Sequence, residues 1–258
     1  MLQGATLSQA GIDAVAIKPA EVDVERAVDL GVERLAVDYE GREHLPSPET
    51  LSALADEKSV RVTMPVRADG FDPLGDRDLA ASLPASVGRV LVAGHPAYLT
   101  ETEQERAVAP RLRKAAARSR DPWVGTEGVE RIALAVGGTQ FELLGPATDR
   151  RLRALRQAGY EGEIALYAPT VLTDEEDAVL DALGAYAARR GPVRSALPDG
   201  APTDAAADGR AREVLSQAVR DYGLVGGVDA VADRVDELRD AGADRIVGYL
   251  ARGLDPFL

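Results

Sequence analysis

Cysteine is absent from this chain of 258 residues, and histidine and lysine are scarce. Without cysteine the chain has no disulfide, no thiolate nucleophile and no cysteine-based zinc site. Histidine occurs only at His44 and His95, and lysine only at Lys18, Lys58 and Lys114. Candidates for imidazole or amine chemistry are therefore few.

Long hydrophobic segments are also lacking. No run of about 18 apolar residues occurs, so the sequence predicts no membrane span. The first residues, MLQGATLSQAG, do not combine a basic segment with a hydrophobic one, so we expect no secretory signal. These two features together predict a cytoplasmic protein.

Acidic residues dominate the charge of the chain. Asp and Glu number 43 against 30 Lys and Arg, for a formal net charge of −13. Such a charge repels phosphate backbones and anionic lipids, so nucleic-acid and membrane-surface partners are not expected. Acid-rich, lysine-poor compositions are similar to those of proteins from salt-accumulating halophiles. The solvent, rather than a partner, then explains the charge.

One sequence pattern occurs three times along the chain: an amphipathic helix, a glycine that ends the helix, a few polar residues and an apolar run. The copies occupy residues 24–40, 151–169 and 231–251. In the last copy Val231, Val235 and Leu238 share one helical face, and Gly242 is placed to end the helix. The apolar runs are too continuous for strands with one wet face. The pattern therefore predicts a parallel sheet covered by helices.

Eight parallel strands can be placed in this alternating order, which predicts a TIM (β/α)8 barrel. We expect a single domain over residues 1–258, with a flexible insertion near residues 195–209 and a short or degenerate seventh strand. The expected strands lie at 12–18, within 24–40, and at 60–66, 87–95, 128–138, 163–169, 223–228 and 245–250.

Functional side chains of such a barrel lie at the carboxyl ends of the strands. Lys18 is a candidate amine nucleophile or a cation paired with a carboxylate, for which Glu21 is close in sequence. Asp38 and Glu40 are candidate acid–base groups or solvated charges. His95 is a candidate proton donor or a loop histidine bonded to backbone. Tyr249 either stacks on a flat ligand or seals the barrel mouth. No metal site is predicted.

Two glycine pairs resemble anion-binding turns. Gly137 and Gly138 end the expected fifth strand and lead through Thr139 into a short expected helix over 141–144, while Gly226 and Gly227 precede the helix that begins near residue 229. Backbone N–H groups at a helix start suit a phosphate. Glycine is also required simply to turn the chain, so that interpretation stays open.

The segment 225–249, VGGVDAVADRVDELRDAGADRIVGY, resembles the closing helix and strand of the luciferase-like flavin- and deazaflavin-dependent oxidoreductases. The segment 131–145, RIALAVGGTQFELLG, resembles their fifth strand, and the acidic helix from Thr173 resembles the helix after their sixth. The resemblance implies flavin mononucleotide or a deazaflavin across the barrel mouth, its phosphate on Gly137, Gly138 and Thr139, and hydride transfer by the cofactor. The chain is shorter than usual members and lacks their Arg-His-Pro signature after the third strand, so the cofactor could equally have been lost.

Two further hypotheses remain open. One is a phosphate-binding isomerase or aldolase barrel, in which Gly226 and Gly227 hold a sugar phosphate while Lys18 or Asp38 moves the proton. The other is a non-catalytic barrel that serves as a binding or scaffold protein. The partner expected in the enzymatic cases is a small, phosphate-bearing molecule, and a homo-oligomer is compatible with the sequence.

Overall fold

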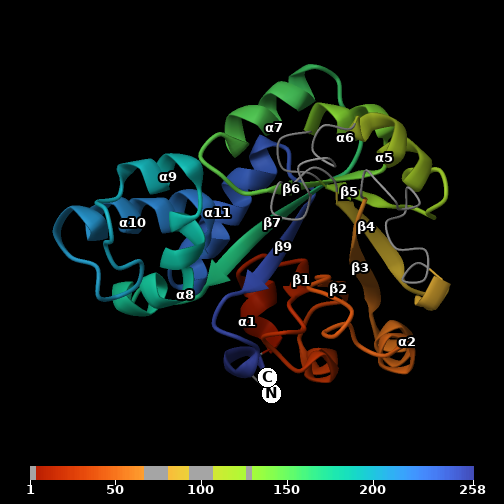
Figure 1. Ribbon diagram of the computed structural model, residues 1–258, viewed down its shortest axis with the longest axis horizontal. Coiled ribbons are helices and arrows are strands. Elements are labelled where there is room, and N and C mark those ends of the chain that lie inside the picture. Colours follow the sequence, from red (N-terminus) through yellow and green to blue (C-terminus); the bar gives the residue numbers. More distant parts are fainter. Residues whose placement is uncertain (1–3, 67–80, 93–106, 126–129) are drawn as a thin grey trace.

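In the part of the chain that the structure describes, nine parallel strands form one sheet that closes on itself (Figure 1). The computed structural model describes residues 4–66, 81–92, 107–125 and 130–258. The strands are β1 Ala14–Ile17, β2 Arg34–Val37, β3 Ser59–Pro65, β4 Gly88–Val92, β5 Trp123–Gly125, β6 Thr139–Leu143, β7 Ile164–Val171, β8 Leu224–Val225 and β9 Arg245–Leu250.

Eight of these strands make a closed ring, so the fold is a TIM barrel, as predicted. Strands β1 to β7 pair in chain order, β7 pairs with β9, and β9 pairs with β1. The expected seventh strand is the two-residue β8, which pairs only with the end of β7 and lies outside the ring.

The prediction of a fifth strand over residues 128–138 is wrong. Residues 130–136 form helix α6, and the ring's fifth strand is β5, to which the sequence analysis assigned no element. A short apolar run such as Ile-Ala-Leu-Ala-Val does not distinguish a strand from a packed helix by its pattern. The helix expected over residues 141–144 is also wrong, because residues 139–143 form strand β6.

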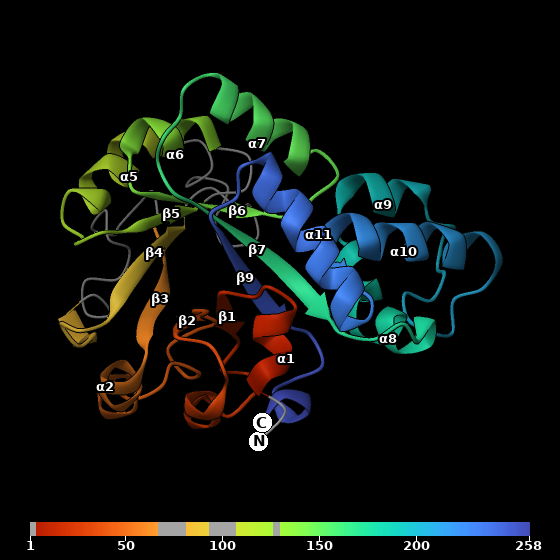
Figure 2. The same cartoon turned by 180° about the vertical axis from the view of Figure 1, so that it is seen from behind.

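Helices surround the ring in both views (Figures 1 and 2). Among the described residues, no helix has the length and apolar character needed to span a membrane. The helices are α1 Gly4–Gln9, α2 Pro48–Glu57, α5 Val108–Ala116, α6 Glu130–Val136, α7 Thr148–Gln157, α8 Glu176–Ala188, α9 Gly191–Ala196, α10 Gly209–Tyr222 and α11 Val228–Ala241, with 3-10 helices η1 Val24–Asp29 and η3 Asp255–Phe257.

Helix α11 shows how the local sequence sets an element. The predicted stripe of Val231, Val235 and Leu238 is buried, and Gly242 ends the helix with φ of +123°. That left-handed conformation costs glycine little because it carries no Cβ.

Alternating side chains divide the core into an outer and an inner layer. In β1, Val15 and Ile17 pack outward beneath the helices, whereas Ala14 and Ala16 face the barrel interior. The interior contains small residues from β1 and β2 and aromatic residues from four other strands, which fill the space that the alanines leave. The inner layer consists of Ala14, Ala16, Ala36, Val90, Trp123, Phe141, Ala165, Tyr167, Val247 and Tyr249.

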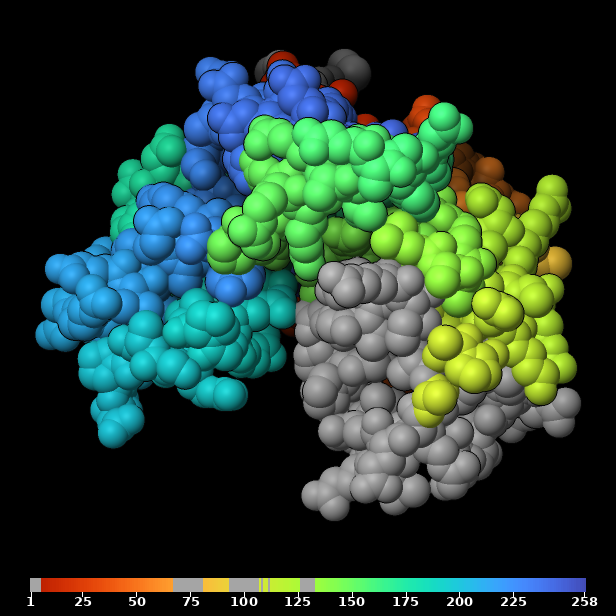
Figure 3. Space-filling view, turned by 90° about the horizontal axis from the view of Figure 1, so that it is seen from above, coloured from red at the N-terminus to blue at the C-terminus, as the bar shows by residue number. Residues whose placement is uncertain are grey.

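Helices α8, α9 and α10 form a lobe with its own small core, which protrudes at one side of the molecule (Figure 3). The segment near 195–209 lies in this lobe between α9 and α10. Within it the Ala205 N–H donates to Asp181 of α8 at 2.9 Å, and Ala207 is buried. The flexibility of this segment stays a prediction.

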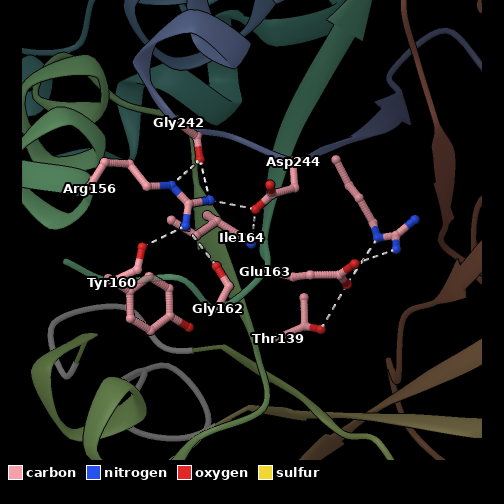
Figure 4. Close-up of polar contacts among 9 residues, drawn as sticks. Thr139, Arg156, Tyr160, Gly162, Glu163, Ile164, Gly242 and Asp244 are labelled. Carbon is pink, nitrogen blue, oxygen red and sulfur yellow. Dashed lines mark hydrogen bonds and ion pairs between the residues drawn. The ribbon is translucent and has the colours of Figure 1, made fainter.

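The amino end of the barrel is held by Arg156 of α7 (Figure 4). Its guanidinium donates to the carbonyls of Tyr160, Gly162 and Gly242 and to the carboxylate of Asp244, at 2.6–3.1 Å. Asp244 also accepts the Ile164 N–H at 2.7 Å. This end of the barrel is therefore a structural network of satisfied backbone groups.

Candidate functional site

The carboxyl ends of β1, β2 and β9 bring four of the predicted site residues together. Lys18 follows β1, Asp38 directly follows β2, Glu40 comes two residues later, and Tyr249 lies near the end of β9. The ladder pairs Ala16 of β1 with Tyr249, so Lys18, two residues after Ala16, lies just beyond Tyr249 at the barrel mouth. Sequence positions far apart thus meet at the end of the barrel where TIM-barrel enzymes carry their active sites.

Lys18, Glu21 and Tyr249 form a connected unit. The Lys18 ammonium lies 4.1 Å from the centre of the Tyr249 ring and 3.3 Å from Glu21 Oε1. The Tyr249 hydroxyl donates a short hydrogen bond to the other oxygen of Glu21. A turn positions Glu21, because its N–H donates to the Lys18 carbonyl at 2.9 Å. The unit fixes the ammonium over an aromatic face, an arrangement that stabilises a cation.

Asp38 is the acid–base candidate at this mouth. Its side chain is partly exposed but surrounded by protein atoms, and this burial raises the pKa of Asp38 to about 7. The Lys18 charge lowers that pKa, while the charges of Glu40 and Glu21 raise it further. A carboxyl group with this pKa exchanges protons readily near neutrality, which is what general acid–base catalysis requires.

Glu40 is tied to the turn after β1. Its Oε2 accepts the Ala20 N–H at 2.9 Å, which joins the loop after β2 to the loop that carries Lys18. Beside it, the Tyr39 N–H donates to the Thr63 hydroxyl of β3 at 2.7 Å. These two bonds fix the chain that directly follows Asp38.

Aromatic rings form the floor beneath these polar groups. Trp123 stacks on Phe141 with centroids 5.7 Å apart, Phe141 meets Tyr167 edge-on at 5.8 Å, and Tyr167 stacks on Tyr249 at 6.3 Å. Burial raises the pKa of the Tyr167 hydroxyl well above its usual value, and the nearby charge of Asp38 adds to this rise. Tyr167 therefore stays protonated, and the floor is an apolar surface carrying hydroxyl groups.

The first predicted phosphate site, Gly137, Gly138 and Thr139, is not at this mouth. These residues join the end of α6 to the start of β6, so they lie at the amino end of the barrel, opposite Lys18 and Asp38. The prediction required a helix to begin after the glycines, but strand β6 begins there instead. A Cβ on Gly138 would stand 2.5 Å from the Pro122 carbonyl oxygen, so this glycine is required for packing.

The second pair, Gly226 and Gly227, does precede a helix at the carboxyl end of the barrel, as predicted. Gly227 is the N-cap of α11, but its N–H donates to the carboxylate of Asp174 at 2.9 Å. The Gly226 N–H donates to the Val171 carbonyl at 3.2 Å. Both amides of the expected phosphate cradle are thus bonded within the chain.

His95 lies outside the described residues. Thr63 was missed by the sequence analysis, and Glu21 was identified only as a carboxylate close to Lys18, not as a partner of Tyr249. Across the described part of the chain, no cluster of three His, Cys, Asp or Glu side chains is placed to hold a metal ion.

Comparison with solved structures finds a similar fold in an F420-dependent secondary alcohol dehydrogenase, determined in complex with an F420-acetone adduct. The TM-score is 0.61 with 11% sequence identity, and the similarity covers 92% of each chain. At this identity the likeness establishes the fold. No curated protein matches the sequence. The sequence pattern of one family, described as a family of unknown function, DUF7388, matches residues 7–257. The chain belongs to this family, DUF7388.

Proposed function

We propose that this protein is a barrel enzyme that transfers a proton on a small substrate bearing a hydroxyl or carbonyl group. Asp38 is the acid–base group, and the Lys18 ammonium faces the substrate oxygen. The observation that carries the proposal is Asp38 itself, whose pKa is raised to about 7 between an apolar floor and a lysine fixed by Glu21 and Tyr249.

The proposed step is simple in its balance of atoms and electrons. The Asp38 carboxylate accepts a proton from the carbon beside a carbonyl group. The electron pair of that C–H bond forms a carbon–carbon double bond, and the π pair of the carbonyl group moves onto its oxygen. The Lys18 ammonium stabilises the negative charge that develops there. Return of the proton to the same carbon completes an exchange. Return to the former carbonyl carbon, with the proton of the adjacent hydroxyl group passing to the other oxygen, completes an isomerisation.

Proton exchange with solvent tests this proposal. In D2O, NMR should detect deuterium entering at least one member of a panel of small hydroxy-ketones and hydroxy-aldehydes, at a rate that rises with pH through about 7 as Asp38 ionises. Asp38→Asn should slow this exchange by about 100-fold or more. Glu43→Gln, a neutralising change at an exposed residue of the same loop, is the matched control and should leave the rate unchanged. No exchange with any member would support the binding or scaffold hypothesis instead, and full exchange by Asp38→Asn would overturn the role of Asp38.

Hydride transfer with a flavin or deazaflavin is a second candidate, favoured by the fold shared with the F420-dependent dehydrogenase over 92% of both chains. Neither predicted glycine pair fits the phosphate of such a cofactor, because the Gly137–Thr139 turn lies at the opposite end and the Gly227 amide is bonded to Asp174. We therefore assign no residue to it. Visible absorption of the purified protein, and titration with F420 and flavin mononucleotide, would decide: copurified or tightly bound chromophore supports this candidate.

A further inference from the structure

The amino terminus of α11 occupies the place where barrel enzymes commonly bind phosphate. α11 begins at Val228, directly after β8, and β8 pairs with the carboxyl-terminal residues Thr170 and Val171 of β7. In barrels of this kind, the loops after the last strands and a helix amino terminus together hold phosphate groups. Free N–H groups and the positive end of the helix dipole provide the attraction.

In this chain a carboxylate already occupies that position. Asp174 Oδ1 accepts the Gly227 N–H at 2.9 Å, and its other oxygen lies 3.0 Å from where a Cβ of residue 227 would stand. The carboxylate thus lies against the glycine, in the space that a ligand oxygen would need. The adjacent Gly226 amide is bonded to the Val171 carbonyl.

A second backbone amide at the same end of the barrel is satisfied in the same way. The Ala20 N–H donates to Glu40 Oε2 at 2.9 Å. The Lys18 ammonium, which could otherwise attract a phosphate, already lies 3.3 Å from Glu21 Oε1. A phosphate entering here would displace a carboxylate from an amide or approach several carboxylates at close range, and both cost free energy.

We propose that Asp174 is a specificity-determining residue that acts as an internal anion, so that the barrel mouth takes unphosphorylated hydroxyl or carbonyl compounds and rejects their phosphate esters. The substrate class rests on the proposed function of Asp38. The exclusion of phosphate rests on the contacts of Asp174 with Gly227 and is testable without any activity.

Inorganic phosphate is the probe for the exclusion. In amide NMR spectra, the Gly227 signal of the wild-type protein should show no saturable shift with phosphate. In Asp174→Ala the freed amide should show a saturable shift, with a Kd on the order of 10 mM or tighter. Glu175→Ala removes the same charge from the neighbouring exposed residue and is the matched control, since Asp174 is the residue that accepts the Gly227 N–H. It should behave as the wild type does.

Two results would overturn the inference. One is saturable phosphate binding at Gly227 in the wild-type protein, and the other is no binding in folded Asp174→Ala. If Asp174→Ala does not fold, Asp174→Gly, which also removes both the charge and the acceptor, takes its place, and the absence of a saturable phosphate shift at Gly227 in that variant would then count against the inference. Phosphate results do not depend on proton exchange at Asp38, so failure of the proposed function and failure of the exclusion are distinguishable.

Discussion

Arg156 donates a hydrogen bond of 2.6 Å to Asp244, and Arg239 makes the equivalent contact with Asp13 at 3.1 Å. In both places the arginine also donates to the carbonyl of the glycine two residues before the aspartate, Gly242 or Gly11. Each aspartate in turn accepts the backbone N–H of an isoleucine on the neighbouring strand, at 2.7 Å in both cases. The same device thus joins α7 to the start of β9 and α11 to the start of β1.

We expect Arg156→Ala to destabilise the fold by roughly 3 kcal/mol, because three carbonyls and the Asp244 carboxylate lose their donor. Arg156→Lys should recover only part of this loss, since a single ammonium does not match the planar guanidinium that reaches several acceptors. Arg153→Ala, at an exposed position of the same helix, should change stability by less than about 0.5 kcal/mol. Urea denaturation measures all three, and equal effects at Arg153 and Arg156 would contradict the structural role.

Gly138 and Gly137 offer a paired test of the turn that joins α6 to β6 at the amino end of the barrel. Both have φ near +88°, but only a Cβ at Gly138 would meet a backbone atom, the Pro122 carbonyl oxygen at 2.5 Å. Gly137→Ala should therefore cost about 1 kcal/mol for its backbone conformation, and Gly138→Ala about 3 kcal/mol or more. Denaturation midpoints compare them directly. Equal losses of stability in the two variants would mean that the backbone shifts to relieve the contact between the new Cβ at residue 138 and the Pro122 carbonyl oxygen.

Those aspects of the fold that depend on local pattern could be predicted from the sequence. The helical part of the repeated pattern ends in Leu-Arg-x-Ala-Gly in its second and third copies. These helices are α7 and α11, and their arginines make equivalent contacts. Residues 130–136 could not be assigned, because seven mostly apolar residues satisfy either a strand or a packed helix. The three-residue β5 is too short to show any period.

The candidate site could be predicted only in part, for a physical reason. Lys18, Asp38, Glu40 and Tyr249 follow from the rule that strand ends carry function. Glu21 could not be identified by that rule, because its partner Tyr249 is 228 residues away and only ring closure brings them together. The glycine pairs were misjudged because the pattern shows neither which end of a strand they occupy nor that Asp174 fills the amide of Gly227.

Salt should raise the thermal stability of this protein. A formal charge of −13 produces self-repulsion, which extends over about 30 Å in dilute buffer and only about 3 Å at molar salt. We expect the melting midpoint to rise by more than about 5 °C between these conditions, despite some weakening of ion pairs such as Arg234–Asp149. Sucrose, an uncharged stabiliser, is the control for excluded-solute effects. An unchanged midpoint in salt would show that the acidic groups are already well paired.

Asp38 should make stability depend on pH with a definite sign. Its folded-state pKa of about 7 lies above the ordinary value of 3.8, so the folded protein binds this proton more tightly than the unfolded chain. The penalty for ionising Asp38 is absent below about pH 4, grows as pH rises to 7, and is constant above it. Asp38→Asn should therefore stabilise the protein at pH 8, by on the order of 2 kcal/mol given the partial exposure, and have little effect at pH 4. A stability difference that does not vary with pH would show that Asp38 ionises as an ordinary carboxyl group.

The charges around Asp38 should move its pKa in opposite directions when they are removed singly. Glu21 and Glu40 raise the pKa of Asp38, and Lys18 lowers it. Glu21→Gln should therefore lower that pKa below 7 and Lys18→Met should raise it, because the first removes a nearby negative charge and the second a positive one. Carbon NMR of the Asp38 carboxyl group across the pH range measures both shifts without any substrate. Glu43→Gln, an exposed carboxylate whose side chain lies beside His44, should leave the titration in place. If neither Glu21→Gln nor Lys18→Met shifts the titration, the Lys18–Glu21–Tyr249 unit does not set the electrostatics of the mouth, and the pKa of Asp38 is governed by burial alone.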